Sequence, residues 1–171
     1  MKELLEAALA NRAHEYAAIP TSALTFVPEL LKACESNICG SYNKNWACPP
    51  GVGTMEEQRR KILAWANAMV FTTRYQLEDS FDFEGMTEAK HIHDRLTREM
   101  REKFSGRPIY GAGGCNICEN CAYPEPCRNP GKVYSSIEAA GINVTELSRA
   151  AGVKYNNGEN TVTYFSMILY N

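Results

Sequence analysis

Hydrophobic positions with helical spacing indicate where the helices of this chain lie. The longest such pattern covers residues 84–104, where apolar side chains recur at every fourth position: Ile92, Leu96, Met100 and Phe104. This spacing places them on one face of a helix, which we expect to pack on the core. His91 and His93 lie on nearly opposite faces of the same helix. Both are expected at the surface, because a helical metal-binding pair needs a gap of four.

Two further segments are predicted to be amphipathic helices. Residues 1–13 carry apolar side chains along one side. Residues 54–66 begin with a capping box, in which Glu57 follows Thr54 by three positions. Shorter helical turns are expected where Pro or Ser begins a segment or Gly follows it, at residues 28–34, 136–140 and 145–151.

Strand patterns are concentrated in three segments. Residues 161–170 are an unbroken run of β-branched, aromatic and apolar residues, typical of a buried central strand. Residues 68–73 are predicted to form a second buried strand, and residues 15–19 a short one ended by Pro20. Strands and helices mixed in this order predict an α/β fold, with α+β as the alternative. We expect one domain, residues 1–171, with a small central sheet flanked by helices and two cysteine-bearing metal loops.

The composition narrows the classes of function. A net charge of −2 leaves no basic excess for binding phosphates, so nucleic-acid binding is not expected. No apolar run reaches the roughly 20 residues that span a bilayer, and the acidic N-terminus does not resemble a secretory signal. We therefore expect no membrane association and a cytoplasmic location. In a reducing compartment, seven cysteines are better explained as metal ligands than as a disulfide framework.

Four of the cysteines fall within thirteen residues, inside a Gly- and Pro-rich segment at residues 105–131. They are Cys115, Cys118, Cys121 and Cys127. Two-residue gaps turn successive thiols toward a common point, where a cubane cluster presents several irons, so a 4Fe–4S cluster is favoured. Zinc is the alternative, although structural zinc sites usually pair two separated C-x2-C knuckles.

The other three cysteines, Cys34, Cys39 and Cys48, lie in or beside a second loop rich in Gly, Pro and Asn, residues 36–53. Free cysteines also pack as small hydrophobes, but these three avoid the periodic apolar positions, which favours metal ligation. Seven thiols do not fill two four-cysteine sites. The sequence therefore allows either one or two iron–sulfur clusters. Cys127 could complete the late set, or it could join Cys34, Cys39 and Cys48.

The same segments resemble a known family, the predicted metal-binding, cysteine-rich proteins of unknown function from anaerobic bacteria and archaea. The resemblance is carried by Cys34-x4-Cys39-Gly40, Asn45-Trp46-Ala47-Cys48-Pro49-Pro50, Gly113-Gly114-Cys115-x2-Cys118-x2-Cys121, Pro126-Cys127-Arg128, and the segment from Ser136 to Val144. It extends from about residue 15 to the end. It implies metal binding in an anaerobic, cytoplasmic setting, and it brings no established activity.

Three functions are open at this point, and the sequence assigns no catalytic residue. The first is a redox module whose cluster passes electrons to a partner protein. The second is an enzyme or sensor in which an iron left open by the three-cysteine set binds a small anionic substrate. The third is a zinc-stabilised interaction domain. A pocket lined by Tyr42, Arg128 or Glu138 beside an exposed metal would favour the second function.

Overall fold

A five-stranded mixed sheet forms the centre of the computed structural model, which describes residues 1–171. The strand order is β1-β2-β5-β3-β4; β3 and β4 are parallel, and the other neighbours are antiparallel. The elements in chain order are α1 (Lys2–Leu9), β1 (Glu15–Pro20), η1 (Thr21–Ala23), α2 (Glu29–Glu35), α3 (Met55–Leu63), β2 (Asn67–Gln76), α4 (Phe83–Lys103), β3 (Ile109–Gly111), β4 (Ser135–Ser136), η2 (Glu138–Ala140), α5 (Val144–Ala151) and β5 (Thr161–Tyr170). The predicted α/β class is confirmed.

The two long strands β2 and β5 are the spine of the sheet. They pair over ten residues, from Asn67 opposite Tyr170 to Gln76 opposite Thr161. Successive side chains of a strand point to opposite faces of the sheet. Because helices cover both faces here, the side chains on both faces of these strands are apolar. The apolar run at 161–170 therefore lies in the middle of the sheet, as the sequence predicts.

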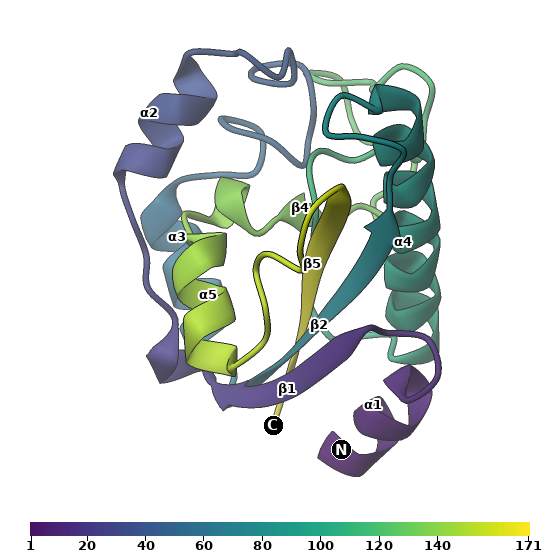
Figure 1. Ribbon diagram of the computed structural model, residues 1–171. Coiled ribbons are helices and arrows are strands. Elements are labelled where there is room, and N and C mark those ends of the chain that lie inside the picture. The colour runs from purple at the N-terminus through teal and green to yellow at the C-terminus, as the bar shows by residue number, and fades with distance from the viewer.

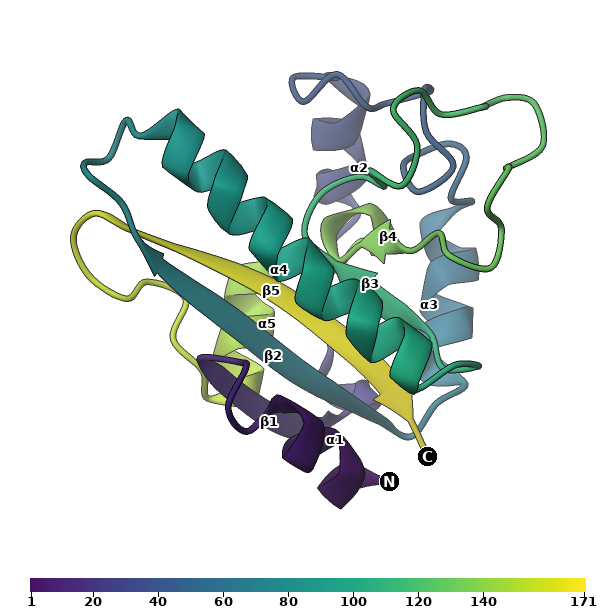
Figure 2. The same cartoon turned by 90° about the vertical axis from the view of Figure 1, so that its right-hand side faces the viewer.

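Helices cover the sheet on both sides (Figure 2). On one face, α1 and α4 bury Leu5, Leu9, Leu96 and Met100 against β2 and β5. On the other face, α3 and α5 contribute Ile62 and Leu147 to a second cluster, with residues from η2 and β1. Each fully buried aliphatic side chain contributes roughly 1.5–3 kcal/mol, so the two apolar clusters hold the sheet and helices together independently of the cysteines.

The helix boundaries follow from local capping. Thr54 and Glu57 form the predicted capping box at the start of α3. Asn143 accepts backbone N–H bonds at the start of α5, and Gly152 ends that helix with a left-handed φ of 66°. None of the helices combines the length and the apolar character that crossing a lipid bilayer would require.

The prediction that Ile92 faces the core and His93 faces water is wrong. His93 is fully buried, whereas Ile92 is 39% exposed. The reason is geometric: with 3.6 residues per turn, a row of every fourth residue drifts around the helix and leaves the buried face after a few turns. The helix buries His93 and Thr97 along with Leu96 and Met100, and polar partners on the sheet satisfy both polar side chains.

Two cysteine-bearing loops lie together at the end of the molecule opposite both chain termini (Figure 1). The early loop, residues 36–54, joins α2 to α3. The late loop, residues 112–134, joins β3 to β4. The strands β3 and β4 were not predicted from the sequence, because three and two residues are too few to show an apolar pattern.

Candidate metal centre

The late loop folds its four cysteines around one small cavity. Cys115, Cys118, Cys121 and Cys127 all line it, and all four are partly buried. Asn45 and Trp46 of the early loop close another side. The four cysteines that the sequence spacing groups together therefore line the same cavity.

Hydrogen-bond donors point at the sulfurs of this set. The side-chain amide of Asn129 donates to Cys118 Sγ over 3.2 Å, and its backbone N–H donates to Cys127 Sγ over 3.4 Å. Burial raises the pKa of Cys115, whereas the backbone N–H of Ile117 opposes that rise. Such donors stabilise the negative charge of metal-bound thiolates, so the loop is suited to soft metal ligation.

Two adjacent glycines let the late loop approach the early one. Gly113 has a left-handed φ of 68°, which is strained for other residues. A Cβ placed on Gly114 would lie only 3.2 Å from Cys48 Sγ. Cys48 of the early loop therefore lies against the backbone that leads into Cys115.

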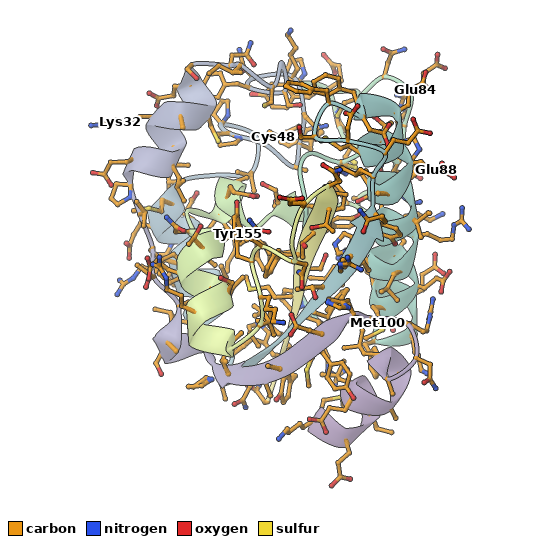
Figure 3. All side chains as sticks on the ribbon, viewed as in Figure 1. Lys32, Cys48, Glu84, Glu88, Met100 and Tyr155 are labelled. Atoms are coloured by element: carbon orange, nitrogen blue, oxygen red, sulfur yellow. The ribbon has the colours of Figure 1, made fainter.

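The three early cysteines lie within electrostatic reach of one another. Burial, followed by the neighbouring charge of Cys39, raises the pKa of Cys34. The same two causes, with contributions from Cys34, Cys115 and then Cys121, raise the pKa of Cys48 to about 11. Cys48 is thus within electrostatic reach of both cysteine sets, in the region between α2 and α4 in Figure 3. Cys39 is exposed, whereas Cys48 is buried.

Side chains of the early loop tie it directly to the late loop. Asn45 Nδ2 donates to the carbonyl oxygen of Cys115 over 3.0 Å, and Trp46 Nε1 donates to that of Glu125 over 2.9 Å. The Trp46 ring packs edge-on against Tyr123 with 5.0 Å between ring centroids. Tyr123 in turn donates its hydroxyl to Asn43 Oδ1. The two loops therefore form one structural unit that includes all the cysteines except Cys34, which lies in the last turn of α2.

Helix α4 supports the start of the late loop through a charged row that sequence reasoning missed. Lys90 Nζ pairs with Asp94 Oδ2 over 2.7 Å, and the same oxygen accepts from Asn116 Nδ2 over 2.5 Å. Arg98 then donates to Asn116 Oδ1 over 3.0 Å. Asn116 follows Cys115 directly, so this row fixes the position of the first cysteine of the run. The four-residue spacing of Lys90, Asp94 and Arg98 was a visible sign of a shared helix face.

The thiols surround space without meeting at a single point. No three Cys, His, Asp or Glu side chains are close enough together to hold one ion. The cavity of the late loop is about 20 Å³, close to the space that one water molecule needs. Binding a metal centre therefore requires the loop to adjust. The donor set, four thiols supported by N–H groups, fits a thiolate-ligated metal or cluster.

The polar side chains of Glu138, His14 and Arg128 occupy three different positions. The charge of Glu138 contributes to the raised pKa of Cys34, after burial and Cys39, so Glu138 lies within electrostatic reach of the early set. His14 instead hydrogen-bonds to Asn157 over 3.2 Å. Arg128 lines the late-loop cavity and donates to the carbonyl oxygen of Asn120.

Residues 17–170 match the model of the family described as predicted metal-binding protein (DUF2284). The chain belongs to this family. The match includes all seven cysteines, so metal binding agrees with the thiol chemistry of the two loops. Comparisons with curated proteins and with solved structures gave no match.

Proposed function

We propose that this protein is an iron–sulfur redox module, in which Cys115, Cys118, Cys121 and Cys127 hold a 4Fe–4S cluster. The observation that carries the proposal is the single cavity that these four thiols line, with N–H donors directed at their sulfurs. A bound cluster of this type supplies a site that accepts and releases one electron at a time. Donors at the sulfurs would favour the more negative, reduced state.

The spacing of the thiols along the chain supports a cluster over a single zinc ion. Four ligands of one zinc ion must converge on a point about 2.3 Å from each sulfur, and structural zinc sites usually pair two separated C-x2-C knuckles. Here Cys115, Cys118 and Cys121 follow one another at two-residue gaps within one loop. A cubane takes each cysteine at a different iron, so closely spaced cysteines can bind it together.

The surroundings of Cys127 support its assignment to the late-loop set. It lines the same cavity as the other three, and its charge is one of the minor causes that raise the pKa of Cys115. By contrast, the charges that raise the pKa of Cys48 come from Cys39, Cys34, Cys115 and Cys121. A second centre at Cys34, Cys39 and Cys48 would then have three cysteine ligands.

A three-cysteine centre beside the first gives a route to a partner. Cys48 lies between the two sets, so electrons would pass through this narrow contact. Cys39 is exposed, and its neighbour Ile38 is 93% exposed, which offers an accessible apolar edge to a redox partner protein. We place this exchange in the cytoplasm, where thiols stay reduced.

An anaerobic redox titration followed by electron paramagnetic resonance tests the proposal. The protein should show a reversible one-electron signal that survives repeated reduction and reoxidation. Cys118→Ser should lose the late-loop signal, whereas Cys39→Ser should leave it in place. A protein without a reversible redox signal would not be an electron carrier.

One observation favours a second candidate, an enzyme or sensor with an open iron. A cavity of about 370 Å³ is lined by Lys90, Gly113 and Glu138, and the charge of Glu138 reaches Cys34. A small substrate with both an anionic and a donor group could bind there next to an iron that lacks a fourth cysteine. Under this candidate, adding a substrate should alter the electron paramagnetic resonance spectrum of the early-set centre. Glu138→Gln should change this response to the substrate. An electron carrier would show no such substrate-dependent change.

A further inference from the structure

A third, larger cavity lies where α4 ends beside the last residues of the late loop. Its volume is about 570 Å³, and its charged and loop residues include Arg98, Arg101, Glu102, Arg107, Gly131 and Lys132. We call it the basic cavity. Four of these side chains are cationic and one is acidic, although the whole chain carries a net charge of −2. Positive charge is therefore concentrated at this place.

The cations of the basic cavity have no acidic partner. None of them takes part in the five salt bridges of the chain. Arg107 Nε is buried without any hydrogen-bond partner, a state that costs free energy in a folded protein. Arg101 donates Nε and Nη2 to the carbonyl oxygen of Gly131 over 3.2 and 3.0 Å. This contact holds the guanidinium in place and leaves other N–H groups free.

Helix capping explains only part of this arrangement. Basic side chains in the last turn of a helix stabilise its carbonyl end, which accounts for Arg101. Arg107 and Lys132 lie outside the helix, and Arg107 has no carbonyl partner. Their convergence on the same cavity calls for an anion.

We propose that the basic cavity binds a small phosphorylated molecule. Its volume falls within the range of small-ligand sites, roughly 300–1,000 Å³. The planar fork of an arginine matches phosphate oxygens, and several cations around one cavity suit a ligand with more than one phosphate group. Arg98 also holds Asn116 beside Cys115, so a bound ligand would contact the support of the late loop. The proposal depends on side chains of the chain alone and holds for any metal.

Isothermal titration calorimetry on the metal-loaded protein tests this site, with inorganic pyrophosphate and adenosine diphosphate as probes. Saturable binding at one site is expected, and it should weaken as salt is added. Tighter binding of adenosine diphosphate would show that the organic part also lies in the cavity. Equal binding would show that phosphate alone is recognised.

Three variants make the result specific. Arg107→Gln should weaken binding by about tenfold or more, because a charge-assisted hydrogen bond is lost. Lys132→Gln, at an exposed position, should weaken it severalfold and remains informative if the Arg107 variant folds poorly. Arg95→Gln, an exposed arginine of α4 outside the cavity, is the matched control and should bind as the unmodified protein does. Lack of binding of either probe at millimolar concentration, or equal weakening by the control, would overturn the proposal.

Discussion

At the scale of single residues, the most informative side chain is His93. It is fully buried, and its ring nitrogens bond to Thr73 Oγ1 over 2.7 Å and Ser166 Oγ over 2.8 Å. Thr97 donates its hydroxyl proton to the His93 carbonyl, so it accepts from Ser166, which in turn accepts from His93 Nε2. This chain of donors requires a proton on Nε2, and burial disfavours a second proton on Nδ1, so the imidazole is neutral.

The neutral state of His93 predicts a dependence of stability on pH. Burial lowers its pKa from 6.5 to about 4. Between these values the unfolded chain binds a proton that the native state rejects. The stability of the native state with respect to His93 is therefore full above pH 6.5. As the pH falls toward 4, the free energy of unfolding decreases by a total on the order of 3 kcal/mol. His93→Gln should flatten the pH profile of urea unfolding between pH 7 and 5.

The control for this prediction is His91→Gln, because His91 is the exposed neighbour on the same helix. It should leave the slope of stability against pH unchanged. The difference in slope between the two variants isolates the buried imidazole from any effect of pH on metal binding. Equal slopes would mean that the pKa of His93 is not lowered in the native protein.

At the scale of elements, α4 links the core to the late cysteine-bearing loop. One face packs on β2 and β5, and a neighbouring row carries Lys90, Asp94 and Arg98 toward Asn116. Asp94 is 1% exposed and bonded through one oxygen to both Lys90 and Asn116. The helix therefore sets the position at which the late loop begins.

Removing the carboxylate of Asp94 should loosen the late loop. Asp94→Ala leaves Lys90 and Asn116 without their shared partner, and breaking a buried ion pair costs on the order of 3 kcal/mol. We expect faster proteolysis within residues 112–134 and a lower urea midpoint. Arg95→Ala, on the exposed side of α4, should change neither. Unchanged cleavage of the loop in the Asp94 variant would contradict its supporting role.

The elements show what sequence can predict and where it fails. The long apolar runs at β2 and β5 and the capping box of α3 were predicted, because each depends on local spacing. The strands β3 and β4 were missed, since two or three residues carry no period and depend on pairing across the sheet. The cysteine spacing predicted the late-loop set, whereas the contact of Cys48 with Gly114 depends on tertiary packing.

At the scale of the whole molecule, the core and the metal loops are held by different forces. Two apolar clusters join the sheet to its helices, whereas the loops rely on side-chain contacts such as those of Asn45 and Trp46. The late-loop cavity is also too small for a cluster without adjustment. A bound metal centre would therefore complete the order of the two loops.

Metal removal should loosen the loops and leave the core intact. After chelation under reducing conditions, far-ultraviolet circular dichroism should retain most of its helix and strand signal. Hydrogen exchange should rise mainly in residues 36–54 and 112–134, where regular backbone bonds are few. Cys118→Ser should reproduce this effect in the late loop. Global unfolding on chelation would mean that the metal holds the core as well.

The central claim, an iron–sulfur centre held by the late-loop cysteines, is tested most directly by metal and acid-labile sulfide analysis of anaerobically purified protein. The protein should be brown and contain iron and sulfide in a ratio near one to one. Cys118→Ser should lose the late-loop share of both. Colourless protein containing stoichiometric zinc and no labile sulfide would contradict it.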